Sequence, residues 1–308
     1  MREDAASRLL RMTTKTPHAS ALAQIPVRTG EVQVLGSSTA YWDYGPPDAE
    51  RTVLLVHGYR GDHHGLEPVI AQLPGIRFIS PDLPGFGLSS PMAAVPHSIS
   101  GYVAWLNDFA RAVEVPADAV LLGHSFGSMI ASHAVADGFP TPGLILVNPI
   151  SADPLVAAGR GITGLTRAFY GVARRLPAGL GRRLLGNWLI VQFMSMSLVT
   201  TDDTELRRWI HEEHHRYFNG FSDPHTVAEG FDASLSTQVG EAAPRVTVPV
   251  LMIAGQSDQI APLSGQQETV TRFPDARLVV LPSVGHLIHY EAPAAAAAAI
   301  RSFLAEHP

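Results

Sequence analysis

The chain has 308 residues, and 46% of them are hydrophobic, which is enough to bury the core of one large domain. Its formal net charge of −6 and its pI of about 6.1 give no overall positive field that would indicate a nucleic acid as partner. It contains no cysteine, which excludes disulfides and thiolate chemistry.

The N-terminal segment is polar. Met1-Arg2-Glu3-Asp4 carries early acids, and no apolar core segment follows, so we expect no secretory signal. Residues 1–30 show no clear period, and we interpret them as a partly ordered leader. No run approaches the roughly 18 apolar residues that a membrane span requires. We therefore expect a soluble, cytoplasmic protein without a transmembrane segment.

The first predicted strands form a hairpin. Residues 31–34 and 40–44 alternate in polarity and are joined by Gly36-Ser37-Ser38. Continuous apolar runs follow, and such runs are typical of parallel strands buried on both faces. The runs are Val53–Val56, Arg77–Ile79, Val120–Leu122, Leu144–Val147, Val250–Ile253 and Leu278–Leu281.

Helical patterns separate these runs. Apolar residues recur at helical spacing in 98–114, where Ser98 or Ser100 is expected to be the N-cap. Residues 128–135 are expected to form a second helix, and the alanine-rich tail 291–304 carries Pro293 at a helix start. Alternating strands and helices predict a doubly wound α/β sheet.

The alternation is interrupted from about 150 to 243. This region has helical patterns and no strand-like run, so we expect a helical cap at 150–243, inserted into a core made of residues 31–149 and 244–308. Its segment 188–199 is rich in Leu, Met and Phe, and we expect this segment to form the core of the cap and to line an apolar pocket.

The most informative motif is Gly123-His124-Ser125-Phe126-Gly127. A Gly-x-Ser-x-Gly between a strand and a helix is typical of a nucleophile elbow, a turn so sharp that only small residues fit on both sides of the serine. The turn lifts the serine hydroxyl clear of the sheet and places the next backbone N–H beside it.

Polar loops follow the other predicted strands as well. Ligands of open parallel sheets bind beyond the carboxyl ends of the strands, so these loops are expected to converge on one site. They are His57-Gly58-Tyr59-Arg60-Gly61, Asp82-Leu83-Pro84-Gly85-Phe86-Gly87, Asn148-Pro149, Gly255-Gln256-Ser257-Asp258 and Gly285-His286.

Together, and in this order, these motifs resemble those of the α/β-hydrolase superfamily in its capped form. The resemblance covers roughly residues 30–305 and implies an α/β-hydrolase fold, a mostly parallel eight-stranded sheet flanked by helices. It implies Ser125 as nucleophile, Asp258 as acid and His286 as base. It also implies the backbone N–H groups of Tyr59 and Phe126 as oxyanion donors. Tyr59 and Arg60 replace glycines of the His-Gly-Gly-Gly loop found in many lipases, which argues against bulky tertiary-alcohol esters.

Alternatives exist for two of the three catalytic residues. Asp153 follows the fourth apolar run and could replace Asp258, but the Gly-x-x-Asp loop favours Asp258. His289 could replace His286, but Gly285 before His286 favours the latter, and His289 is expected on the helix surface or the pocket wall. His57 and His124 are expected to make structural hydrogen bonds. The candidate pocket residues are His57, Gly58, Arg60, His124, Met194 and His289.

Two further patterns lie in the predicted cap. His211-Glu212-Glu213-His214-His215 matches the His-Glu-x-x-His zinc template, but no third ligand motif follows, and a solvated helix is the favoured interpretation. Residues 154–201 hold six arginines and no acid. The simpler interpretation of these arginines is a solvated face of the cap. The more specific hypothesis is a surface that binds an anionic lipid or an anionic group of the substrate.

The sequence thus predicts a serine hydrolase that cleaves small to medium, apolar carboxylic esters through an acyl-enzyme, with no cofactor and no metal. The same three residues also serve C–C bond hydrolases, amidases, aminopeptidases, thioesterases and cofactor-free haloperoxidases of the superfamily. Epoxide hydrolases and dehalogenases are disfavoured because they carry Asp where this chain has Ser125. A ligand receptor without turnover is the alternative of another class.

Overall fold

The computed structural model describes residues 16–151 and 160–307. Within them, eight strands form one sheet in the order β1-β2-β4-β3-β5-β6-β7-β8. β2 pairs antiparallel with β1 and β4, and all other neighbours are parallel. The strands are β1 Val27–Val34, β2 Ser37–Tyr44, β3 Thr52–Val56, β4 Arg77–Pro81, β5 Val120–His124, β6 Leu144–Val147, β7 Val250–Gly255 and β8 Ala276–Leu281. The predicted hairpin, the six strands and the α/β architecture are confirmed. The expectation of burial on both faces is wrong for β8, because β8 lies at the edge of the sheet and is mostly half-buried, with Val280 37% exposed.

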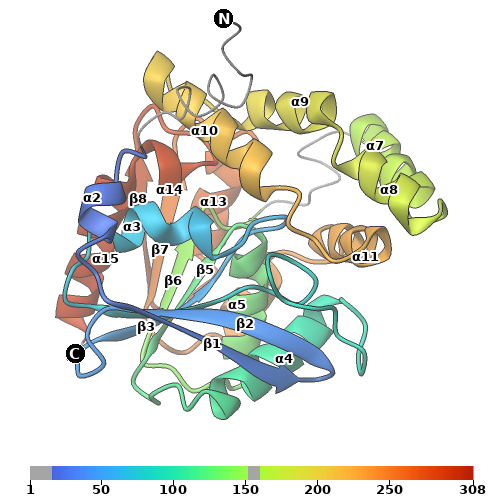
Figure 1. Cartoon of the computed structure of the whole chain (residues 1–308). Helices are drawn as coiled ribbons and strands as arrows, with labels where there is room; N and C mark the ends of the chain where they lie inside the picture. Colours follow the sequence, from blue (N-terminus) through green and yellow to red (C-terminus); the bar gives the residue numbers. More distant parts are fainter. Residues whose placement is uncertain (1–15, 152–159, 308) are drawn as a thin grey trace, which may run out of the picture.

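Helices cover both faces of this sheet (Figure 1). The helices of the sheet layers are α2 Ala19–Leu22, the 3-10 helix η1 His63–Leu66, α3 Glu67–Ile70, α4 Ile99–Ala112, α5 Phe126–Ala136, α13 Leu263–Val270, α14 Ile288–Glu291 and α15 Pro293–Glu306. Ser98 caps α4, because its side chain accepts a hydrogen bond from the backbone N–H of Gly101 at 3.1 Å.

The first strand begins earlier than the sequence predicted. α2 and the first four residues of β1, 27–30, fall within the segment 1–30 that was interpreted as a partly ordered leader. The remainder of that segment, residues 1–15, lies outside the described residues. The side chains of β1 are exposed or half-buried up to Val34, so the apolar pattern that identifies a buried strand is missing here.

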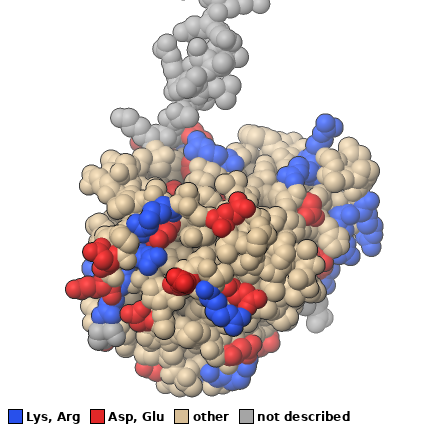
Figure 2. Space-filling view, turned by 60° about the horizontal axis from the view of Figure 1, so that its bottom comes forward, with Lys and Arg blue, Asp and Glu red and all other residues tan. Residues whose placement is uncertain are grey.

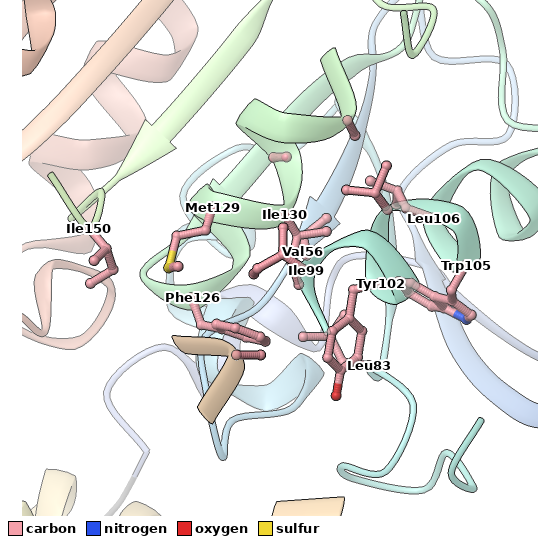
Figure 3. Close-up of a cluster of buried hydrophobic side chains, with 14 of the residues drawn as sticks. Val56, Leu83, Ile99, Tyr102, Trp105, Leu106, Phe126, Met129, Ile130 and Ile150 are labelled. Carbon is pink, nitrogen blue, oxygen red and sulfur yellow. The ribbon is translucent and has the colours of Figure 1, made fainter. Parts of the chain in front are cut away.

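The buried strands divide their side chains between two apolar layers. In β3, Leu54 and Val56 face one layer, while Val53 and Leu55 face the other, as the two-residue period of a strand requires. The first layer packs against α4 and α5 and is shown in Figure 3, with Val56, Tyr102, Trp105, Leu106, Phe126, Met129 and Ile130 labelled. Each large side chain buried here contributes about 1.5–3 kcal/mol to folding.

A second group of helices lies between β6 and β7 in the chain and beyond the carboxyl ends of the parallel strands (Figure 1). It consists of α7 Arg160–Ala173, α8 Ala178–Leu185, α9 Trp188–Leu198, α10 Thr204–Tyr217 and α11 Pro224–Ser234. The following α12 Val239–Ala242 and the 3-10 helix η2 Ala243–Arg245 pack against α5 in the sheet layers instead. Among all described residues, no helix is both long and apolar enough to cross a membrane.

Candidate active site

Ser125 lies at a strained turn between β5 and α5. Its backbone has φ 52° and ψ −117°, in a region that residues with a side chain rarely adopt. A Cβ atom at Gly123 would overlap the carbonyl oxygen of Gly127, and one at Gly127 would overlap that of Val56. Both glycines are therefore required by close backbone approach, which is the physical reason for the sequence motif.

Three side chains from three loops form a hydrogen-bonded chain. Ser125 Oγ lies 2.8 Å from Nε2 of His286, and Nδ1 of His286 lies 2.8 Å from Oδ2 of Asp258. All three loops follow the carboxyl ends of parallel strands, namely β5, β7 and β8. The structure thus brings together the serine, histidine and aspartate that the sequence singled out, whereas the alternative Asp153 lies outside the described residues.

The carboxylate of Asp258 is surrounded by donors. The backbone N–H groups of Ile260 and Ala261 donate to Oδ1 at 2.8 Å each, and Nδ2 of Asn148 donates to Oδ2 at 2.9 Å. Burial raises the pKa of Asp258, but the neighbouring His286 and these hydrogen bonds outweigh burial and leave the pKa lowered. Asp258 is therefore held as a carboxylate beside the imidazole.

Asn148 lies in one of the loops that the sequence predicted to converge on the site, but the sequence reasoning gave it no role. It is fully buried, and its amide bridges Asp258 to the backbone carbonyl of Gly285, at 3.2 Å, next to His286. Its φ of 46° is left-handed, a conformation that Asn tolerates better than most residues. An Asn directly after a buried strand was the available signal, but its partners are 110 and 137 positions away.

The candidate oxyanion donors, Tyr59 and Phe126, line one cavity together with Ser125. Phe126 is the first residue of α5, and such N–H groups have no partner inside the helix. Tyr59 lies in the loop after β3. Neither backbone N–H donates a hydrogen bond to an acceptor within residues 16–151 and 160–307, so both are available to an oxyanion.

Arg60 fixes this loop to the helices beyond the sheet. The guanidinium is buried, donates to the carbonyl of Phe218 at 3.0 and 3.2 Å and donates to that of Leu185 at 3.1 Å. Leu185 is the last residue of α8, and Phe218 is the C-cap of α10, so the cation lies at the negative ends of two helices. The hydroxyl of the adjacent Tyr59 donates to the carbonyl of Val227 in α11 at 2.8 Å.

Two cavities adjoin Ser125 and His286. The larger has a volume of about 310 Å³, and its walls are mostly apolar, with Tyr170, Met194, Leu198 and Phe231 among its lining. The smaller has a volume of about 80 Å³. Every candidate pocket residue lines one of them: Arg60 and Met194 the larger, and His57, Gly58, His124 and His289 the smaller.

Three histidines that line the smaller cavity, His57, His124 and His289, are buried, and burial favours their neutral form. Burial lowers the pKa of His124 to about 3, and it also lowers the pKa values of His57 and His289. His57 makes structural hydrogen bonds: Nε2 accepts from the backbone N–H of Leu83 at 2.8 Å, and Nδ1 donates to the carbonyl of Gly58 at 2.8 Å. His289 packs edge-on against His124 rather than on an exposed helix surface.

The described residues contain one group of three possible metal ligands with ligand atoms within 4.8 Å of one another: Asp62, His63 and His64. Their ring nitrogens already contact carboxylates, since Nδ1 of His63 lies 2.8 Å from Asp82 and Nδ1 of His64 lies 3.1 Å from Asp62. The histidines of the zinc-like pattern on α10 have other partners. His211 contacts Ser195, and His215 contacts Gln192.

The expectation for residues 188–199 is only partly right. Met194 and Leu198 line the larger cavity, as expected. The expectation that this segment forms core is wrong for Trp188, Leu189, Phe193 and Met196, whose exposed fractions are 61%, 70%, 74% and 63%. The sequence cannot distinguish the two faces of this helix, because both are apolar.

Comparison with known proteins agrees with the fold. The model of the alpha/beta hydrolase family matches residues 53–299. A pimeloyl-[acyl-carrier protein] methyl ester esterase of Aeromonas hydrophila is 26% identical over 248 residues, which cover 76% of this chain and 87% of that protein. The magnesium-chelatase 30 kDa subunit of Rhodobacter capsulatus is 26% identical over 278 residues, which cover 87% of this chain and 92% of that protein. A thermophilic esterase from Thermogutta terrifontis shares the fold, with a TM-score of 0.72 and 24% identity. The alignment covers 91% of this chain and 100% of that esterase.

Proposed function

This chain belongs to the alpha/beta hydrolase family, and on that premise we propose that it hydrolyses carboxylic esters through an acyl-enzyme formed on Ser125. The observation that carries the proposal is the chain of 2.8 Å contacts from Ser125 through His286 to Asp258. Serine is a weak nucleophile until a neighbouring base removes its proton, and this arrangement supplies the base and the carboxylate that orients it.

Acylation follows from the orientation of the imidazole. With Nδ1 donating to Asp258, Nε2 of His286 accepts the proton of Ser125 while Oγ attacks the ester carbonyl carbon. The resulting oxyanion accepts hydrogen bonds from the backbone N–H groups of Tyr59 and Phe126. The carbon–oxygen bond to the alcohol then breaks, and the alcohol leaves with the proton from Nε2.

Deacylation repeats these steps with water. His286 takes a proton from water, the hydroxide attacks the acyl carbon, and the bond to Ser125 breaks as Oγ recovers the proton from Nε2. The acid is released, and the serine is restored. Since a protonated His286 cannot act as base, hydrolysis is expected to fall as the solution is acidified.

The larger cavity favours a small to medium, apolar substrate. Its walls include Tyr170, Met194 and Phe231, and its volume of about 310 Å³ lies at the lower end of small-molecule pockets, which span roughly 300–1,000 Å³. We propose that residues 150–243 act as the cap that sets this volume. The guanidinium of Arg60 already bonds two carbonyls, so we assign it to holding the cap rather than to binding an anionic substrate.

The proposal is tested by hydrolysis of p-nitrophenyl esters from acetate to long acyl chains. Ser125→Ala is expected to lower kcat to background, a loss that reaches roughly a million-fold in serine hydrolases. Ser132→Ala, the same change at a buried serine two turns along α5, is the matched control and should retain activity.

A fluorophosphonate that labels the nucleophile separates the remaining outcomes. Labelling of Ser125 without ester turnover would redirect the substrate class to amides, thioesters or carbon–carbon bonds of vinylogous diketones. A single acylation without turnover would indicate a receptor. Absence of both hydrolysis and labelling in folded protein would refute the proposal.

A further inference from the structure

The outer face of α9 exposes an unusual amount of apolar surface. Trp188, Leu189, Phe193 and Met196 are each more than 60% exposed, and α9 carries no charged residue. The opposite face is engaged with the protein: Val191 and Ser195 are buried, and Met194 and Leu198 line the larger cavity. A helix that is apolar on all sides is expected inside a protein or a membrane. The exposed apolar face of α9 is therefore expected to be covered by an apolar partner.

The segment that contains this helix carries positive charge and no acid. Residues 160–201 contain six arginines, at 160, 167, 174, 175, 182 and 183, and no Asp, Glu or Lys. Asp232 of α11 contacts Arg167 at 3.2 Å and Arg174 at 3.8 Å. Arg175 and Arg183 are exposed, and no carboxylate of the described residues forms an ion pair with either. In Figure 2, arginines gather at the right edge, the side on which α7 and α8 lie in Figure 1.

We propose that the outer face of α9, with Arg175 and Arg183 beside it in the chain, docks onto the surface of an anionic lipid bilayer. Exposed Trp, Phe and Leu insert at the level of the lipid headgroups, and arginines pair with anionic headgroups. Charge favours a bilayer over a second copy of this chain. A symmetric contact would bring the same arginine-rich, acid-free segment face to face with itself.

Docking here would place the bilayer next to the catalytic centre. α9 forms one wall of the cavity that adjoins Ser125 while its outer face meets the lipid, so an apolar ester could pass from the bilayer to the serine along this helix. This consequence rests on the proposed ester hydrolysis, whereas docking itself does not.

The test is co-sedimentation of the full chain with phosphatidylcholine vesicles and with vesicles that also contain phosphatidylglycerol. We expect at least about tenfold tighter binding to the anionic vesicles, weakening as salt is added. We also expect a blue shift of tryptophan fluorescence on binding that is lost in Trp188→Phe, since Trp188 is the exposed tryptophan of the surface.

Two pairs of substitutions separate the apolar and ionic contributions. Leu189→Ser with Phe193→Ser, and separately Arg175→Glu with Arg183→Glu, should each weaken binding at least about tenfold. Arg111→Glu is the matched charge control and should leave binding unchanged, because Arg111 is exposed on α4, which lies at the opposite end of the molecule from α9 in Figure 1.

Thermal unfolding and hydrolysis of a water-soluble short ester check that each variant is folded. Equal binding to both kinds of vesicle, or wild-type binding by both pairs of variants, would overturn the docking surface. So would a concentration-dependent dimer that Phe193→Ser abolishes, because a second copy would then be the occupant. The soluble-ester assay is expected to be unaffected by these variants, so a failure of docking is distinguishable from a failure of the proposed function.

Discussion

Replacing Arg60 by Met should destabilise the protein and impair catalysis together. The methionine keeps an apolar stem but removes three hydrogen bonds to the carbonyls of Leu185 and Phe218, at 3.0–3.2 Å. A hydrogen bond from a charged donor contributes about 1.5–3 kcal/mol, and a buried acceptor left unpaired costs about 1–3 kcal/mol. Removing the desolvated charge itself offsets part of this loss.

Summed over the two carbonyls and reduced by this offset, the loss should lower the free energy of unfolding by about 3–5 kcal/mol. In a chain of this size that corresponds to a Tm lower by roughly 10 °C. Because Arg60 adjoins Tyr59, the oxyanion donor should also lose its position. We expect kcat for a soluble ester to fall by about tenfold or more at a temperature where the variant is folded, with a smaller change in KM.

Arg182→Met is the matched control. Arg182 also donates to backbone carbonyls, those of Phe221 and Ser222, and its guanidinium lies over the Phe221 ring at 5.2 Å, compared with 5.5 Å for Arg60. It is exposed and does not adjoin the oxyanion loop, so its loss should cost less than about 1 kcal/mol. Urea unfolding and steady-state kinetics measure both effects. Equal stability of the two variants, or an unchanged kcat in Arg60→Met, would refute the reasoning.

The remaining predictions concern the acid, the buried histidines and the cavity. Asn148→Ala removes a donor to Asp258 and should lower kcat about tenfold while fluorophosphonate still labels the serine; unchanged kinetics would contradict this. His214 is buried, and its pKa is lowered to about 3, so its neutral form stabilises the protein above the unfolded pKa of about 6.5, and that stability is lost as the pH falls toward 3. His214→Gln should therefore reduce the dependence of unfolding free energy on pH by on the order of 1 kcal/mol per unit between pH 6 and 4, and equal slopes would contradict the assignment. Met194→Trp fills the larger cavity and should shift the preferred acyl chain to shorter lengths, whereas an unchanged preference would place the acyl group elsewhere.

Much of the fold was predictable because burial on both faces leaves a continuous apolar run. Val53–Val56 and Val250–Ile253 were identified in this way, and the structure places both inside the sheet. β1 lacks this signal because it lies at the edge of the sheet with exposed side chains, so Val27–Gly30 was assigned to the leader. Edge strands are specified by pairing with a neighbour more than by their own pattern.

The candidate site also contains features that the local sequence predicts and features that depend on distant contacts. Ser125 was predictable because the steric demands of its turn are local and appear as glycines at fixed positions. The loop of Asn148 was predicted to reach the site, but its role was not, because that role depends on Asp258 and Gly285, which only the folded sheet brings to it. The exposure of Phe193 was not predictable either, since an apolar residue on a helix indicates burial unless the opposite face is already known to be buried.

The contacts of Arg60 indicate how the side chains of the helices beyond the sheet can vary while these helices stay bonded to the loop of Tyr59 and Arg60. Most of these contacts are with backbone atoms, because the guanidinium bonds the carbonyls of Leu185 and Phe218 and the hydroxyl of Tyr59 bonds that of Val227. The guanidinium also donates to two side chains, to Oδ1 of Asn219 at 3.3 Å and to Sδ of Met194 at 3.6 Å. Backbone acceptors survive substitution of the side chains around them, provided that the helix ends stay in place. The side chains that line the cavity can therefore vary, and with them the substrate, while the loop that carries the candidate oxyanion donor keeps its support.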